Sequence, residues 1–100
     1  MQQGGTVYIL INPLHTVLYT GVTSDLIKRM QQHRNKFFPE SFTSKYNVTI
    51  LVYYAFYSTI KEAILEEKRI KAGNRKQKND LINSMNPEWE DLWEKEVSYW

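Results

Sequence analysis

Apolar positions near the start of the chain fall into two strand-like runs. Thr6–Asn12 (TVYILIN) is rich in β-branched and aromatic residues, and Thr16–Gly21 (TVLYTG) repeats this character after the turn signal Asn12-Pro13-Leu14-His15. We expect a β-hairpin over the first 21 residues. The strongest strand signal comes later, in Val48–Tyr57 (VTILVYYAFY). Its nearly continuous apolar character predicts a central strand covered on both faces.

A helix is expected directly after the hairpin. Thr23 and Ser24 are candidate N-cap residues, Asp25 suits the positive end of a helix dipole, and apolar positions then recur at helical spacing to about Asn35. The following segment, residues 36–46, contains Pro39 and predicts an irregular loop. Its aromatic residues are expected to pack onto the body of the domain: Phe37, Phe38 and Phe42.

Helical signals dominate the second half of the chain. Thr59 and Glu62 have the spacing of a capping box, which predicts a helix over Ile60–Ala72 with a stop at Gly73-Asn74. Arg75–Met85 favours another short helix. Asn86-Pro87 is predicted to cap and start a last helical turn, with Trp89, Leu92 and Trp93 on its apolar side. The order of elements indicates the α+β class, with a small, mainly antiparallel three-stranded sheet flanked by helices.

Length and composition limit the alternatives. One hundred residues with 42% apolar and 14% aromatic content predict a single domain over residues 1–100, with a core at about 5–93 and a short C-terminal tail. The absence of cysteine excludes a disulfide scaffold and a thiol nucleophile. The N-terminus has no signal-peptide pattern, and no apolar run approaches the ~20 residues of a membrane span. We therefore expect a cytoplasmic protein that does not enter a membrane.

Charge is distributed unevenly along the chain. Residues 1–80 carry 12 Lys and Arg against 6 Asp and Glu, whereas residues 81–100 carry one Lys against five acidic residues. A basic body with an acidic tail favours a polyanionic partner, although a solvated helix surface gives the same pattern. Seven basic residues between Lys61 and Lys78 offer contacts to a phosphate backbone.

Several polar side chains stand on otherwise apolar elements. Tyr8 alternates with its apolar neighbours, and Tyr19 ends the second strand of the predicted hairpin. Arg29 and His33 are four residues apart and share a helix face, while Glu67 lies within a charged helix. Each residue alone also fits an ordinary strand or surface position, so only their combination is informative.

In order and spacing, these residues resemble the GIY-YIG nuclease superfamily. Thr6-Val7-Tyr8 and Tyr19-Thr20-Gly21 match its two name-giving motifs, and Arg29, His33 and Glu67 match its later positions. The resemblance is strongest to small stand-alone members that are similar to the N-terminal domain of the UvrC excinuclease, and it covers roughly residues 5–93. Those members share further segments seen here as Lys45-Tyr46, Leu51-Val52-Tyr53-Tyr54, Glu62-Ala63-Ile64 and Asn86-Pro87-Glu88-Trp89-Glu90-Asp91-Leu92.

The chain departs from the family pattern in three places. The first motif lacks its Gly and Ile, and the second has Thr in place of Ile. The family's Lys after the second motif is replaced by Val22, so a second phosphate-binding cation is either missing or supplied by Lys28 or Lys45. Asn79 lies at a spacing compatible with the family's Asn after the metal ligand.

The resemblance implies phosphodiester hydrolysis with one divalent metal ion, Mg²⁺ or Mn²⁺. Glu67 would hold the metal, which would stabilise the leaving 3′ oxygen, and Arg29 would clamp the scissile phosphate. Tyr8 would orient or deprotonate the attacking water, with Tyr19 and His33 positioning that water or sharing its proton. Whether Tyr8 or His33 is the base stays open.

The implied partner is nucleic acid, expected to be DNA, in repair or recombination. Side chains expected to bind it are Lys28, Lys45, Arg75, Lys76 and Asn79. An alternative is a nucleic-acid-binding module of the same fold with little or no cleavage. A third possibility is a protein partner, or a second copy of the chain, docked on the tail that carries Trp89, Trp93 and Trp100.

Overall fold

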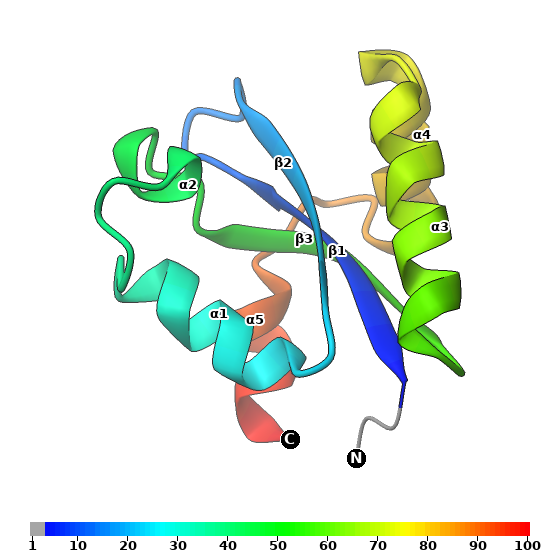
Figure 1. Cartoon of the computed structure of the whole chain (residues 1–100). Helices are drawn as coiled ribbons and strands as arrows, with labels where there is room; N and C mark the ends of the chain where they lie inside the picture. The colour runs from blue at the N-terminus through cyan, green and yellow to red at the C-terminus, as the bar shows by residue number, and fades with distance from the viewer. Residues whose placement is uncertain (1–3) are drawn as a thin grey trace.

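A computed structural model describes residues 4–100. Three antiparallel strands form one sheet in the order β2-β1-β3, and helices lie on both of its faces (Figure 1). The elements in chain order are β1 (Gly5–Ile11), β2 (Leu18–Thr23), α1 (Leu26–Arg34), α2 (Phe42–Lys45), β3 (Ile50–Tyr57), α3 (Ile60–Ala72), α4 (Arg75–Met85), α5 (Leu92–Lys95) and the 3₁₀ turn η1 (Val97–Tyr99). The α+β class and the antiparallel sheet predicted from the sequence are confirmed.

The central strand is β1 rather than β3. All seven residues of β1 are buried, and it pairs with β2 on one side and with β3 on the other. The prediction of a central strand at residues 48–57 is therefore wrong. Both strands are apolar runs, so their composition does not show which one is central. Burial within β3 is complete at Leu51–Tyr53 and decreases over Tyr54–Tyr57.

Alternation along β1 divides the core into two halves. Val7, Ile9 and Ile11 face α3 and α4, where they pack with Ala63 and Ile70. Tyr8 and Leu10 face the opposite side, where α1 and α5 supply Leu26, Met30 and Leu92. Figure 1 shows α3 and α4 to the right of the sheet and α1 and α5 to its lower left. The strand period thus assigns Tyr8 to a different layer from α3.

Capping residues explain where the long helices begin. Thr59 with Glu62 and Asn74 with Gln77 form complete capping boxes, so α3 and α4 occupy the residues predicted for them. The first helix is capped by Asp25, whose side chain accepts from the amide of residue 28, and not by Thr23 or Ser24. The Asp25 carboxylate therefore both caps the first turn of α1 and interacts favourably with the positive end of the helix dipole.

The predicted loop over residues 36–46 contains the short helix α2. Ser41 is its N-cap and accepts from the amide of Ser44, a local signal that the polar composition concealed. Phe37, Phe38 and Phe42 do not pack down as expected, because they are 66%, 48% and 47% exposed. The buried residues of this segment are instead the small Thr43 and Ser44.

The chain after α4 is fixed to the sheet by one amide side chain. Asn86 is buried and donates to the carbonyls of Val52 (3.2 Å) and Glu90 (2.8 Å), and it accepts from the amide of Glu90 (3.0 Å). It closes α4 and does not start the last helix, which begins at Leu92 after the cap Asp91. The prediction of a helical turn starting at Asn86-Pro87 is therefore wrong.

Aromatic residues of the tail lie against the chain's own sheet and helices. Trp89 and Trp93 border the two halves of the core, as expected. The Trp100 ring packs edge-on against Tyr54, with ring centroids 5.4 Å apart, and its centroid lies 5.6 Å from that of Phe56. Both partners belong to β3. Docking of a partner on this tail stays a prediction.

Candidate active site at the β1–β2 hairpin

Residues of the two hairpin motifs lie directly opposite each other. Tyr8 of β1 pairs with Gly21 of β2 in the antiparallel register. A Cβ atom added at Gly21 would lie 2.5 Å from both Cζ and Oη of Tyr8 and 2.9 Å from the Tyr19 ring. Position 21 therefore requires glycine because the Tyr8 ring leaves no room for a side chain. Its φ angle is not positive, so backbone conformation does not require glycine there.

Tyr8, Tyr19 and His33 form one compact group, which we call the Tyr–His cluster. The Tyr8 hydroxyl and Nε2 of His33 are 2.9 Å apart in a buried hydrogen bond. Ring centroids are 5.7 Å apart for Tyr8 and His33, 5.8 Å for Tyr19 and His33, and 6.3 Å for the two tyrosines. The structure thus brings together three of the five residues singled out as catalytic.

Thr43 holds the other side of the His33 ring. Its Oγ1 lies 3.0 Å from Nδ1 of His33, and the threonine is buried. Sequence reasoning missed Thr43 because it placed this segment in an irregular loop. The spacing of Ser41 and Ser44 around it, which caps α2, was the available signal. Thr43 therefore orients the imidazole that contacts Tyr8.

Burial makes both hydrogen-bonded groups neutral near pH 7. Desolvation, together with the neighbouring Tyr19, raises the pKa of Tyr8 to about 12, and the opposing effect of Arg29 is smaller. Desolvation and the positive charge of Arg29 lower the pKa of His33 to about 4. A protonated phenol thus lies beside an imidazole whose unprotonated nitrogen can accept its hydrogen bond, and the proton stays on Tyr8 in the free protein.

Arg29 lies at the rim of the Tyr–His cluster. Its charge lowers the pKa of both Tyr8 and His33, so the guanidinium is within electrostatic range of both rings. One guanidinium nitrogen donates to Gln32 at 3.0 Å, and the guanidinium carbon lies 5.7 Å from the Phe38 ring centroid. The cation is positioned to meet an anion that approaches the cluster.

Glu67 comes from α3, in the other layer. The residue is buried, with its side chain 11% exposed, and Oε2 lies 2.6 Å from Nζ of Lys71 one turn later. Its negative charge contributes, as the smallest effect, to the raised pKa of Tyr8. Glu67 is therefore linked to the Tyr–His cluster by electrostatics across the narrow edge of the sheet at β2, which α3 contacts.

Glu67 is the carboxylate whose charge acts on Tyr8, and it is the candidate ligand for a divalent cation at this site. Within residues 4–100, no group of three or more His, Cys, Asp or Glu side chains could enclose a metal ion. Mg²⁺ commonly binds through one or two carboxylates, with waters and substrate phosphate oxygens completing its shell. Glu67 fits this mode, provided that Lys71 yields its place beside Oε2.

The residues expected to bind nucleic acid do not form one surface. Lys28 and Lys45 belong to α1 and α2, on the side of the Tyr–His cluster, and Lys45 lies 3.5 Å from Glu40. Arg75 instead donates to the carbonyls of His15 and Thr16, at 3.2 Å each, and to Asn79 at 3.0 Å.

Lys76 pairs with Asp80 at 2.9 Å on the same helix as Arg75 and Asn79. Arg75 thus ties α4 to the hairpin turn, and α4 packs on the face of the sheet opposite Tyr8.

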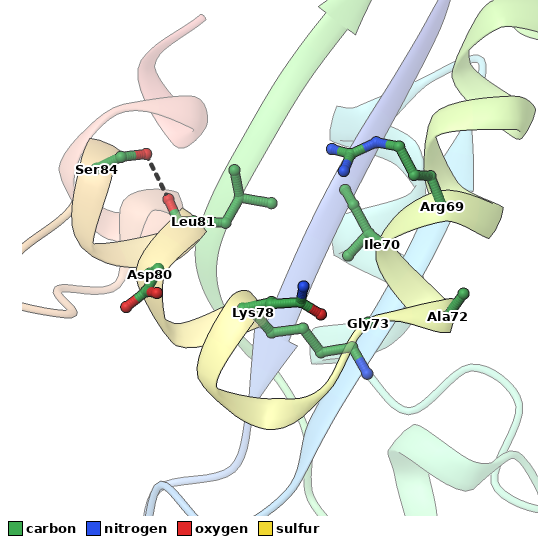
Figure 2. A pocket seen from close by; sticks show the side chains of 9 residues that line it. Arg69, Ile70, Ala72, Gly73, Lys78, Asp80, Leu81 and Ser84 are labelled. Carbon is green, nitrogen blue, oxygen red and sulfur yellow. Dashed lines mark hydrogen bonds between the residues drawn. The ribbon is translucent and has the colours of Figure 1, made fainter.

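A cavity of about 560 Å³ lies between α3 and α4, and its lining includes Arg69 and Lys78 but none of the five residues singled out as catalytic. Figure 2 shows Arg69 and Ile70 on one wall and Leu81 on the other, with the Ser84 hydroxyl donating to the Leu81 carbonyl.

Among residues 4–100, no helix is both long enough and apolar enough to cross a bilayer.

Comparisons with known proteins agree with the hairpin geometry. A UPF0213 protein of Clostridium perfringens is 37% identical over 81 residues, covering 81% of this chain and 85% of its own length. The solution structure of a UPF0213 protein from Bacillus halodurans superimposes with a TM-score of 0.56 at 25% identity, over 88% of this chain and 92% of that one. Residues 4–80 match the family described as the GIY-YIG catalytic domain. The chain belongs to the GIY-YIG catalytic domain family.

Proposed function

We propose that the protein is a divalent-metal-dependent endonuclease that hydrolyses phosphodiester bonds of DNA, similar to the N-terminal domain of the UvrC excinuclease and acting in repair or recombination. The observation that carries this proposal is the buried hydrogen bond between Tyr8 and a neutral His33, beside the Arg29 cation. Membership of the GIY-YIG family supports a nuclease-type function and nucleic-acid binding.

The neutral imidazole gives the proposed base a defined proton path. In the tautomer with hydrogen on Nδ1, His33 donates to Thr43, and Nε2 accepts the hydroxyl proton of Tyr8. When Tyr8 takes a proton from the attacking water, its own proton passes to Nε2 of His33. The water oxygen then bonds to phosphorus as the bond to the 3′ oxygen breaks. In the free protein the raised pKa of Tyr8 disfavours a phenolate, and the lowered pKa of His33 equally disfavours an imidazolium. An anionic phosphate bound at Arg29 offsets the positive charge that helps to lower the pKa of His33, so the proposed transfer belongs to the substrate complex.

Arg29 and Glu67 are proposed to act on the phosphate itself. Arg29 binds a non-bridging phosphate oxygen and stabilises the charge that builds on it during attack. Glu67 holds Mg²⁺ or Mn²⁺, and the bound metal supplies stabilisation of the leaving 3′ oxygen. Lys71 turns away from Glu67 when the metal binds, because both cations use the same carboxylate.

Cleavage of plasmid and branched DNA in Mg²⁺ or Mn²⁺ tests the proposal. The wild-type protein should nick these substrates, whereas Arg29→Ala and Glu67→Gln should be at least about 100-fold slower. Glu66→Gln is the matched control, since Glu66 neighbours Glu67 on α3 but pairs with Arg69. Equal nicking by the wild type and by both site variants would show a contaminating nuclease and overturn the proposal.

A second candidate function is binding without cleavage. It is favoured by the burial of the Tyr–His cluster, because Tyr8 is 1% and His33 4% exposed, and by the ion pair that occupies Glu67. A binding module should hold DNA with an affinity that falls steeply with salt and should leave it uncut in either metal. Metal-dependent cleavage that is lost in Glu67→Gln would exclude this function.

A further inference from the structure

Four aromatic side chains are exposed next to the Tyr–His cluster. Phe37, Phe38, Phe42 and Tyr46 are between 47% and 66% exposed, and we call them the aromatic strip. They form two pairs, Phe37 with Phe38 and Phe42 with Tyr46, each with ring centroids 4.9 Å apart. Exposed aromatic side chains gathered on one short segment mark a candidate interaction site.

Each pair of the strip touches a residue of the candidate active site. The Arg29 guanidinium lies 5.7 Å from the Phe38 ring centroid. On the other side, Phe42 stacks on Tyr19 with centroids 6.3 Å apart and an angle of 27° between the ring planes. The strip is therefore continuous with the site at two points, so a strand held at Arg29 meets aromatic faces at once.

The segment that carries the strip is basic. Residues 26–49 contain five Lys and Arg against the single acidic residue Glu40. Arg34 is neutralised by Asp91 at 3.1 Å and Glu94 at 2.9 Å, and Lys45 lies 3.5 Å from Glu40. Lys28 and Lys36 are exposed and precede the aromatic rings in sequence. Exposed cations on the same segment as exposed rings match a ligand that is both polyanionic and aromatic.

We propose that the aromatic strip stacks unpaired bases of the DNA strand whose phosphate lies at Arg29. Base faces are hidden inside a duplex, whereas a single strand offers them to aromatic side chains while its backbone follows nearby cations. The inference rests on the proposed function and deepens it, because it names DNA with unpaired bases next to the scissile bond as the substrate class.

Binding measured without cleavage tests the strip directly. Glu67→Gln protein in EDTA is titrated against an end-labelled single strand, and against the duplex of the same sequence, by fluorescence anisotropy. The single strand should bind more tightly than the duplex. Adding Phe38→Leu and Phe42→Leu should weaken single-strand binding about fivefold or more for each lost stack and leave duplex binding unchanged.

Three controls separate stacking from folding and from charge. Tyr99→Leu removes an exposed aromatic ring from η1 and should change neither affinity. Phe42→Trp should preserve single-strand binding because it retains an aromatic face. The dependence of affinity on salt should stay unchanged in the leucine variants, since no phosphate contact is removed. A 2-aminopurine base in the strand should be quenched on binding to the parent protein and less so by the leucine variants.

Equal single-strand affinity with and without the strip would overturn the inference, as would equal affinity of the parent for duplex and single strand. Self-association that disappears in the leucine variants would instead assign the strip to a second copy of the chain. None of these readouts depends on cleavage. An inactive wild-type protein that still binds single strands through the strip would refute the nuclease proposal alone.

Discussion

The ring of Tyr8 fills the space that a side chain at position 21 would occupy. Gly21→Ala places a methyl group 2.5 Å from the end of a buried ring that cannot turn away. We expect a loss of about 1–3 kcal/mol in the free energy of unfolding from this overpacking. Cleavage should fall about 100-fold because Tyr8 is displaced from His33.

Urea denaturation and cleavage rates check this prediction against Gly73→Ala. There the added Cβ meets Oε1 of Gln77 at 2.7 Å, so Gln77 must give up the capping bond that this oxygen accepts from the Asn74 amide. That variant should lose about 1 kcal/mol of stability and retain its cleavage rate. Wild-type behaviour of Gly21→Ala would contradict the steric role assigned to Gly21.

His33 predicts how stability depends on pH. Its pKa is about 4 in the folded protein and about 6.5 in the unfolded chain, so the unfolded state binds more protons between these values. Stability should therefore fall as pH drops from 6.5 to 4, by up to ~3 kcal/mol from this residue. Urea midpoints measured at pH 7, 5.5 and 4.5 should show a weaker dependence in His33→Gln. The same slope in both proteins would contradict the buried, neutral imidazole.

Lys71 competes with a divalent metal for Glu67. Lys71→Gln removes the ammonium group from Oε2, and this pair between an exposed lysine and a largely buried carboxylate is expected to be worth about 1 kcal/mol. Mn²⁺ affinity measured by calorimetry should therefore rise by up to about fivefold. Lys68→Gln, an exposed lysine on the same helix, is the control for general charge effects. Unchanged affinity in Lys71→Gln, or an equal rise in Lys68→Gln, would refute the competition.

At the scale of elements, Asn86 fixes the tail to the sheet. Asn86→Ala removes bonds to Val52 and Glu90 from a buried position, which should cost about 2–3 kcal/mol of unfolding free energy. Asn83→Ala, an exposed residue of α4 whose Oδ1 accepts from Trp89, should cost less. The two unfolding curves check the difference, and equal losses would show that Asn86 does not anchor the tail.

Local signals decided which elements could be predicted. Helices α3 and α4 begin with capping boxes, so their bounds follow from side chains within one turn. Strand order depends on which strands pair, and two equally apolar runs carry no such information, so β1 was not recognised as central. The short helix α2 was not predicted because it has only four residues and its Ser41 cap follows Pro39, which favours an irregular loop.

In the candidate site, too, features with a local sequence signal could be predicted, and contacts set by tertiary packing could not. Tyr8, Tyr19, Arg29, His33 and Glu67 were selected from the sequence by motif order, and the first four lie together on one face of the sheet. The roles of Arg75 and Asn79 could not be foreseen, because the carbonyls that Arg75 binds belong to a turn about 60 positions earlier. Side-chain partners at such separations are set by tertiary packing, which motif spacing does not encode.

At the scale of the whole molecule, the sheet separates two contributions to one proposed site. The Tyr–His cluster and Arg29 come from the layer of α1, and Glu67 comes from α3 behind the other face. Glu67 acts on Tyr8 through the small electrostatic effect that helps to raise the pKa of the phenol, and α3 contacts both β1 and β2. We propose that the two layers act on one phosphate.

A double-variant cycle on cleavage rate tests most directly whether both layers act on one phosphate. Single-turnover cleavage in Mn²⁺ is measured for the wild type, Tyr8→Phe, Glu67→Gln and the double variant. Each single change should slow cleavage about 100-fold or more, and the double variant should be no slower than the slower single variant, because residues that act as a unit are not additive. A single site would be contradicted if either single variant cleaved at the wild-type rate. It would also be contradicted if the rate loss in the double variant equalled the product of the two single losses.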